Sequence, residues 1–534
     1  MVGKAICATI AAMLWTQPCL GQSASEQFGE VHFPISCSPA AQQQFEHGVA
    51  MLHSFFFPET VKAFTAISKS EPSCAMAYWG IAISQRPNPL VAPFAPEVMR
   101  KGWEAIEAGR AAGAKTQREK DWIESLAVFF KDYDKVDLRT RTSAYETAMA
   151  QLSARYPDDD EAAIFYALAL NEAVDLNDKT FAKQLKAAAI LQGLEAKRPN
   201  HPGIPHYIIH SYDFAAICQQ GLPAARRYAG LAPSAPHALH MPSHTFSMLG
   251  LWEESIAANW KTIAAGKDYA AKNNLDGVYP ADPHSYDFIQ YAYLQLGHDG
   301  KAKAVMEEVG AIRKVFSPRL ASDTALAAVP ARYMLERQDW RGAAGLLVPA
   351  TVNAPPAKAI IHFARAIGAA RSGDFTAAQA DIEKLKELSA ELAKTNQPYW
   401  SGQVDVQILA ARAWLAQGQS HVAEAVKLMR AAADLEDSSE KHVAMENRLY
   451  PMREPLADLL QAQGEPAAAL TEYEASMKSA PERLRGFYGA AKAAQALGDK
   501  EKAAGHFRRL TRLTQGADSD RPEIREAKQF AAAR

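Results

Sequence analysis

GEPAAALTEYEASMKSAPERLRGFYGAAKAAQALGDKEKAAGHF, residues 464–507, is the stretch of sequence that decides the fold. Three kinds of residue recur in this stretch at a spacing of 34 residues. They are a glycine (Gly464 and Gly498), an alanine (Ala469 and Ala503) and an aromatic residue (Tyr473 and Phe507). A glycine suits the turn between two helices, an alanine lets them approach, and an aromatic fills the gap to the next pair. The period therefore predicts stacked helix pairs, because one pair alone cannot bury its apolar face.

Weaker copies of this pattern extend the prediction upstream. Turn-like segments lie at residues 249–252, 296–299, 338–340, 372–374 and 417–418, and Gly48, Phe64 and Pro72 keep the repeat spacing. The segments between them show apolar residues at i, i+3 and i+4, as in residues 162–173, and no useful β-alternation. We therefore predict an all-α chain, a tetratricopeptide-like (TPR-like) solenoid of stacked antiparallel helix pairs in a right-handed superhelix. Four prolines interrupt it at residues 86–96.

The chain divides by sequence into four parts. We assign residues 1–21 to a signal peptide, 22–40 to an N-terminal extension, 41–350 to N-terminal and central helix pairs with a histidine-lined groove, and 351–534 to C-terminal helix pairs. Lys4, a short apolar stretch and small Gly21 are typical of a signal peptide cleaved after Gly21. We expect a periplasmic or secreted protein without membrane insertion, since the apolar stretch is too short for a stable span.

The composition of the chain limits the kinds of partner that it can bind. With 58 Lys and Arg against 60 Asp and Glu, and no long basic block, the chain lacks the clustered positive face that nucleic acid requires. Export would leave Cys37, Cys74 and Cys218 in an oxidising compartment, where a disulfide is stable. Cys37 and Cys74 precede helices of adjacent pairs, whose starts lie side by side. A Cys37–Cys74 bridge and two buried thiols are equally consistent with this spacing.

Four segments resemble a known family. They are GVAMLHSFF at residues 48–56, CAMAYWG at 74–80, HPGIPHYIIHSYD at 201–213 and HALHMPSHTF at 237–246. With these signatures the chain resembles a family of exported bacterial TPR proteins over nearly its whole mature length. The resemblance implies the fold and the export, and it implies no activity and no catalytic residues.

Histidines concentrate in the centre of the chain, where six of the 15 fall within residues 201–244. Residues at i and i+4 share a helix face, so His206 and His210 form one stripe, and His240 and His244, with His237 one turn before them, form another. Counting back from the turn glycines predicts that one set of side chains faces the inner groove. That set comprises His206, His210, Asp213, His237, His240, His244, His284 and Asp287. Neutral imidazoles with carboxylates suit zinc, copper, iron or nickel. We therefore predict a transition-metal site there, zinc, copper or iron being the candidate ions. His53 is a more distant candidate.

Other readings of the cluster remain open. The histidines can be a hydrogen-bonded ladder between helices, or they can line a groove for a peptide. Asp213, Asp287 and Tyr207 can be ligands or acceptors that orient imidazoles. Tyr207 follows His206 where HExxH has glutamate, which excludes the zincin motif, and no P-loop, dinucleotide fingerprint or GxSxG motif occurs.

Three functions follow from these features. The first is a binding scaffold that holds a protein or peptide ligand in its groove and carries a transition metal there. The second is a metal-dependent enzyme, and the third is a metal-free interaction scaffold of the cell envelope. The polar trio at residues 440–442 is expected in a solvated loop.

Overall fold

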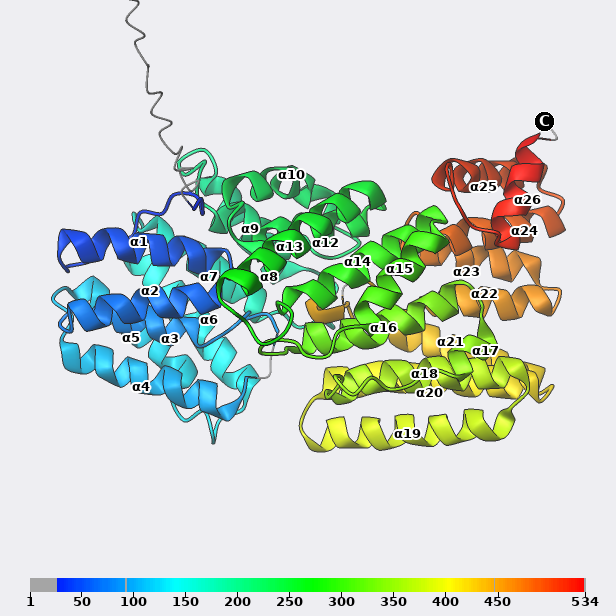
Figure 1. Cartoon of the computed structure of the whole chain (residues 1–534), viewed down its shortest axis with the longest axis horizontal. Helices are drawn as coiled ribbons and strands as arrows, with labels where there is room; N and C mark the ends of the chain where they lie inside the picture. Colours follow the sequence, from blue (N-terminus) through cyan, green and yellow to red (C-terminus); the bar gives the residue numbers. More distant parts are fainter. Residues whose placement is uncertain (1–25, 92–93, 446, 533–534) are drawn as a thin grey trace, which may run out of the picture.

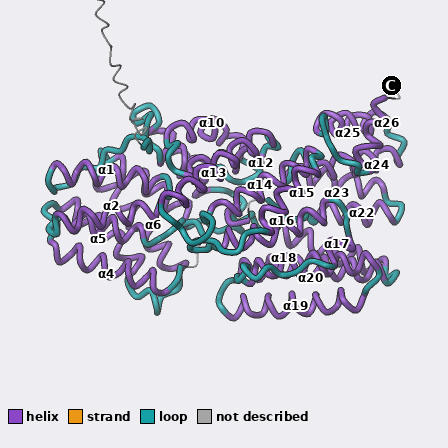
Figure 2. Tube along the Cα trace, in the orientation of Figure 1, coloured by secondary structure: helices purple, strands orange, loops and turns teal. Residues whose placement is uncertain are grey.

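The computed structural model describes residues 26–91, 94–445 and 447–532, so the predicted signal peptide lies outside the described residues. Figure 2 shows helices joined by loops throughout. Within the described ranges there is no β-strand, and Val278 and Val315 form an isolated parallel bridge. The all-α prediction is thus confirmed. None of the helices in these ranges combines the length and the apolar character that a membrane crossing requires.

The N-terminal helices begin where the sequence caps them. The Ser38 hydroxyl accepts a hydrogen bond from the Ala41 amide with Pro39 in the first turn, and Thr116 and Glu119 form a capping box. These helices lie at one end of the elongated molecule (Figure 1). They are α1 (Pro39–His53), α2 (Phe57–Ser70), α3 (Ala75–Ser84), α4 (Pro96–Ala112), α5 (Gln117–Phe130), α6 (Leu138–Arg155), α7 (Asp160–Glu172) and α8 (Ala182–Leu194).

The central helices are less regular in length. They are α9 (Gly203–Ser211), the 3-10 helix η1 (Cys218–Gly221), α10 (Leu222–Leu231), α11 (Pro236–His240), α12 (Pro242–Met248), α13 (Trp252–Lys272), α14 (Ala281–Leu296), α15 (Asp299–Gly310) and α16 (Leu320–Glu336). Short helices occur where proline and glycine interrupt the sequence, as at Pro236 and Pro242.

The C-terminal helices occupy the other end of Figure 1. They are α17 (Trp340–Ala344), α18 (Pro355–Ser372), α19 (Phe375–Lys394), α20 (Pro398–Gly418), α21 (Val422–Asp437), the 3-10 helix η2 (Val443–Met445), α22 (Arg453–Ala462), α23 (Pro466–Ser479), α24 (Leu484–Ala496), α25 (Lys500–Leu513) and α26 (Pro522–Ala532). Neighbours along the chain pack together, as α18 does with α19 and α24 with α25.

Glycines and aromatic residues of the C-terminal period occupy turns and helix contacts. Gly464 and Gly498 adopt left-handed backbone angles, φ 76° and 77°, which glycine accepts without steric cost. The aromatic of the repeat packs against a glycine on the next helix. A Cβ added at Gly489 would lie 2.2 Å from Cζ of Tyr473, and one added at Gly80 would lie 2.4 Å from the ring of Phe64. Helix α24 therefore approaches α23 closely because residue 489 has no side chain.

Two large cores run along the molecule. One joins buried apolar residues from positions 28 to 279, and the other joins those from 263 to 503. Of the expected extension, residues 22–40, the described part up to residue 38 forms no helix, and α1 begins within the extension at Pro39. Phe33 is nevertheless fully buried against Trp79 and Trp122. The predicted division between residues 350 and 351 falls in the loop before α18, and the second core continues across it.

Cys37 and Cys74 form a disulfide with Cα atoms 5.5 Å apart. Cys37 precedes α1 and Cys74 is the N-cap residue of α3, so two helix starts do lie side by side. Of the two readings of these cysteines, the bridge is the one observed. Cys218 is buried and lies outside this disulfide.

Candidate metal centre

The six central histidines of the predicted set lie on four short or neighbouring helices. Helix α12 contacts α9, α11 and α14, and these elements supply His206, His210, His237, His240, His244 and His284. Pro242 has no N–H and separates α11 from α12. Met241 between them keeps helical angles, φ −52° and ψ −37°. His240 and His244 therefore remain on one face across the break.

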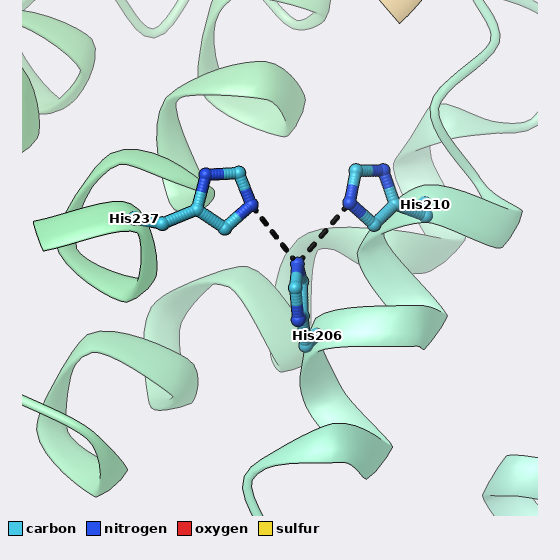
Figure 3. A group of neighbouring side chains, drawn as sticks. All are labelled: His206, His210 and His237. Atoms are coloured by element: carbon cyan, nitrogen blue, oxygen red, sulfur yellow. Dashed lines mark hydrogen bonds between the residues drawn. The ribbon is translucent and has the colours of Figure 1, made fainter. Parts of the chain in front are cut away.

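The structure divides the six imidazoles into two trios. In the first trio, Nε2 of His206 lies 3.1 Å from Nε2 of His210 and 3.2 Å from Nε2 of His237 (Figure 3). The second trio is His240, His244 and His284. In each trio one ligand atom per residue lies within 4.8 Å of the others. Two nitrogens bound to one ion at about 2.05 Å with tetrahedral angles lie about 3.3 Å apart, so both trios have the span of a metal site.

The trios are adjacent. The ring centroids of His210 and His244 are 6.0 Å apart, and those of His237 and His240 are 6.2 Å apart. Each trio also packs against one phenylalanine ring. The Phe55 centroid is 4.5 Å from that of His206, and the Phe288 centroid is 4.9 Å from that of His240. Phe55 adopts φ 52°, a strained angle for a bulky residue, which the surrounding packing must stabilise.

Hydrogen bonds assign the tautomers of three imidazoles. Nδ1–H of His206 donates to the His53 carbonyl oxygen at 2.5 Å. Nδ1–H of His244 donates to Oδ2 of Asp213 at 2.9 Å. Nδ1–H of His240 donates to Oδ1 of Asn259 at 2.7 Å, and the Asn259 amide is oriented because its Nδ2 donates to the Ser255 carbonyl. Each acceptor can only accept, so the proton of each neutral ring sits on Nδ1.

This assignment leaves Nε2 of His206 and Nε2 of His240 without a proton, so each can accept a hydrogen bond or bind an ion. Nε2 of His240 lies 3.0 Å from Nε2 of His244. In the first trio, Nε2 of His206 can accept only one hydrogen bond, although two ring nitrogens approach it.

A third group of candidate ligands is different in kind. His53 and His201 both donate from Nε2 to Glu161, at 2.9 and 2.8 Å. Nδ1 of His53 accepts from the Tyr207 hydroxyl, and Nδ1 of His201 accepts from the Gly203 amide. Every ring nitrogen in this group has a complementary partner. We therefore assign it as a closed hydrogen-bond network that holds the His53 carbonyl against His206, and not as a metal site.

Burial lowers the pKa of five of the six imidazoles and favours their neutral form. It lowers the pKa of His210 to about 3, and the neighbouring His244 imidazole acts in the same direction. Burial also lowers the pKa of His284 to about 3. The pKa values of His206, His237 and His240 fall well below the ordinary value of 6.5 for the same reason, with adjacent imidazoles adding to the effect. Neutral imidazole is the form that binds a metal.

Asp213 and Lys441 form a buried pair beside the trios. Lys441 Nζ lies 3.1 Å from Oδ1 of Asp213, and the lysine side chain is 7% exposed. The expectation that residues 440–442 are solvated is therefore wrong for this residue. Burial alone would raise the pKa of Asp213, but the Lys441 ammonium and His244 outweigh it and hold that pKa well below its usual range.

The loop that carries Lys441 lies against the central helices. Thr324 of α16 donates to the Ala444 carbonyl, and Arg332 of the same helix donates to the carbonyls of Asn447 and Arg448. Arg332 also pairs with Asp287 at 3.2 Å. Asp287, a candidate ligand by sequence, is thus held by a guanidinium and joins neither trio.

The sequence pointed to all six imidazoles of the trios. It left Asp213 open as a ligand or an acceptor, and the structure shows it accepting from His244 and paired with Lys441. It assigned His237 to the stripe of His240 and His244, whereas the structure places it with His206. It did not find Asn259 or Lys441, since neither belongs to a motif near the histidines. It also offered no partner for His53, because Glu161 lies 108 residues away.

A cleft of about 630 Å³ reaches the first trio at His210 and is also lined by Asn171, Gln184 and Phe214. His237 and His284 are partly exposed, one in each trio. Comparison with protein-family models and with curated proteins found no match for the chain.

Proposed function

We propose that the protein is a transition-metal-binding protein whose ions lie in the two histidine trios. The observation that supports this most is that Nε2 of His206, whose ring proton is held on Nδ1 by the His53 carbonyl, lies 3.1 Å from Nε2 of His210 and 3.2 Å from Nε2 of His237. The single lone pair on Nε2 of His206 suits one hydrogen bond, whereas a cation at the centre of the trio would bind all three nitrogens.

The orientation of the rings supports the same proposal. Histidine ligands of metals usually donate their second ring N–H to a carboxylate or carbonyl oxygen, which fixes the tautomer. His206 has a backbone carbonyl in this role, His244 a carboxylate and His240 an amide oxygen. These three rings are therefore preorganised with Nε2 directed at their neighbours in the metal-free protein.

We further propose that the setting is an exported, TPR-like solenoid of helix pairs that acts as a scaffold around the centre. The recurrence of left-handed glycines at the turns and of aromatic rings against glycines supports the repeat. The Cys37–Cys74 disulfide is consistent with export, since disulfides persist mainly in oxidising compartments. The signal-peptide assignment remains a prediction from sequence.

Metal analysis tests the proposal. Purified chain is stripped with a chelator, incubated separately with zinc, copper or ferrous salt, desalted and analysed for bound metal. The wild type should retain metal, and a His206→Ala, His240→Ala double variant, which removes the central ligand of each trio, should lose it.

His362→Ala is the matched control. His362 is also a helical histidine whose Nδ1 donates to a carboxylate, Asp381, at 2.7 Å, but it lies outside the trios. This variant should retain as much metal as the wild type. Wild type that takes up none of the three metals, or a double variant that binds as much as wild type, would show that the trios are not metal sites.

A further inference from the structure

We infer that the cleft beside the first trio binds a small, uncharged organic molecule through an amide group, and that it binds this molecule best when a metal occupies the trio. This inference rests on the proposed function and adds the class of ligand. The cleft of about 630 Å³ reaches His210, one of the three imidazoles of the trio. Pockets for small organic molecules usually measure roughly 300–1,000 Å³, so the cleft has the size of a ligand site.

Three packed helices supply the buried polar groups of the cleft. Helices α7, α8 and α9 all contact one another. Glu172 ends α7, Gln184 lies in the first turn of α8 and His210 in the last turn of α9, and all three side chains line the cleft. The ends of α7 and α9 are tied together, because Nδ2 of Asn171 donates to Oγ of Ser211 at 3.0 Å.

Each of these three side chains has one polar atom without a hydrogen-bond partner among the residues that the structure describes. The atoms are Nε2 of Gln184, Nδ1 of His210 and Oε1 of Glu172. Gln184 is 1% exposed, His210 is 5% exposed, and the Glu172 side chain, which pairs with Arg86, is 2% exposed. An unpaired buried polar atom is unfavourable, so these three atoms favour a ligand that pairs with them.

Metal binding determines the role of His210. Its Nε2 faces Nε2 of His206 and is the atom that would bind the ion, and Nδ1 lies on the side of the ring away from His206 (Figure 3). A neutral imidazole that binds an ion through Nε2 carries its proton on Nδ1, which is then a donor. In the metal-free chain the ring can donate from Nε2 to His206 instead, which leaves Nδ1 as an acceptor. The metal-loaded chain therefore offers two N–H donors to the cleft, one from His210 and one from Gln184.

An amide group matches these donors and the remaining acceptor. A carbonyl oxygen has two lone pairs and can accept from both His210 and Gln184, and an amide N–H can donate to Oε1 of Glu172. A cationic ligand is disfavoured, because the two N–H groups present positive charge to it.

An anionic ligand is disfavoured for a different reason. Each cation that lines the cleft is already paired with a carboxylate, Arg139 with Asp175, Lys183 with Glu146 and Lys441 with Asp213. An anion would compete with these carboxylates for their partners. Phe94 and Phe214 also line the cleft and can pack against an apolar part of the ligand. The surroundings therefore favour an uncharged amide with an apolar group.

The test is calorimetric titration with N-acetylphenylalanine amide, an uncharged molecule with two amide groups and one aromatic ring. The wild-type chain is titrated after it has been stripped with a chelator and after it has been loaded with the ion that it retains best, and bound metal is measured on the same samples. The loaded chain should bind the amide. The stripped chain should bind it about tenfold more weakly, because one donor is lost. N-acetylphenylalanine, which has a carboxylate in place of the terminal amide, should also bind about tenfold more weakly.

A variant of Gln184 tests the second donor. Gln184→Met removes the N–H with little change in side-chain volume, and it should weaken binding of the amide about tenfold while the metal content stays that of the wild type. Gln192→Met is the matched control, since Gln192 is an exposed glutamine of the same helix and does not line the cleft. This control should bind the amide as the wild type does.

Several outcomes would overturn the inference. Equal affinity of the stripped and the loaded chain would refute the link to the metal centre. Wild-type affinity in Gln184→Met would refute the role of that donor, and binding of N-acetylphenylalanine as tight as that of the amide would refute the class of ligand. A chain that retains metal and binds neither compound would refute this inference and leave the proposed function intact, whereas a chain that retains no metal would refute the proposed function itself.

Discussion

Protonation of buried histidines should destabilise the metal-free protein between pH 7 and 5. The contributions of two of them, His210 and His284, to the free energy of unfolding can be calculated. The pKa values of His210 and His284 are about 3 in the folded chain, against about 6.5 in an unfolded chain. Below pH 6.5 the unfolded state therefore binds protons that the folded state rejects. Stability from these groups is fully present above pH 6.5 and is lost progressively as the pH falls toward 3.

The magnitude follows from the difference in pKa. Each pH unit below 6.5 costs about 1.4 kcal/mol for each such histidine. Between pH 7 and pH 5 this amounts to about 2 kcal/mol for His210 and about 2 kcal/mol for His284. The two histidines together therefore contribute about 4 kcal/mol, and the other imidazoles with lowered pKa values act in the same direction. Asp282 acts in the opposite direction, because burial raises the pKa of its carboxyl to about 7 and the folded chain binds this proton between pH 7 and 5. Asp282 is present in both the wild type and the histidine variant, so its contribution cancels when the two are compared.

The assay is urea unfolding with a chelator present, at pH 7, 6 and 5, for the wild type and a His210→Gln, His284→Gln double variant. Each protein is compared with itself at pH 7, so the intrinsic cost of the substitutions cancels. The double variant should lose about 4 kcal/mol less between pH 7 and 5 than the wild type. A His32→Gln, His421→Gln variant changes two exposed histidines and should follow the wild type. An unchanged pH dependence in the His210, His284 variant would refute the reasoning.

Three further predictions concern the Asp213–Lys441 pair, the Cys37–Cys74 disulfide and the contact between Gly489 and Tyr473. Lys441→Met leaves the Asp213 carboxylate buried without its cation and should lower the free energy of unfolding by roughly 3–5 kcal/mol. Adding Asp213→Asn should recover part of that loss, and a double variant as unstable as the single one would contradict this. Cys37→Ser opens the Cys37–Cys74 disulfide and should lower the free energy of unfolding by roughly 2–4 kcal/mol; an unchanged thermal midpoint would show that the bridge constrains little. Gly489→Ala should destabilise by about 1–3 kcal/mol because its Cβ meets a tyrosine ring, whereas Gly505→Ala, which meets nothing within 4 Å, should be neutral or stabilising. Equal denaturation midpoints for the two alanine variants would argue against the close-packed repeat.

The helical architecture was predictable because its determinants are local. A turn glycine, a small contact residue and an aromatic recur at a spacing set by the length of two helices. Gly418 shows the limit of this reasoning. The sequence places a turn at residues 417–418, but α20 continues through Gly418, and the left-handed residue is Ser420, φ 64°.

The candidate centre was predictable in its members and not in its grouping. Helical periodicity places His206 with His210 and His240 with His244. The position of His237 depends on the angle between α9 and α11, which tertiary packing determines. The groups around the histidines could not be predicted for a related reason. Lys441 comes from a loop far along the chain from Asp213, and no local sequence pattern links the two residues.

The two trios differ in how they are connected to the Cys37–Cys74 disulfide. The covalent loop closed by Cys37 and Cys74 contains both the His53 carbonyl that holds the proton of His206 and the Phe55 ring that packs on the same trio. The second trio depends instead on Asn259, Asp213 and Phe288, which lie outside that loop. Reductant should therefore loosen one trio before the other. A redox change at one covalent bond would then release an ion from the first trio before one from the second.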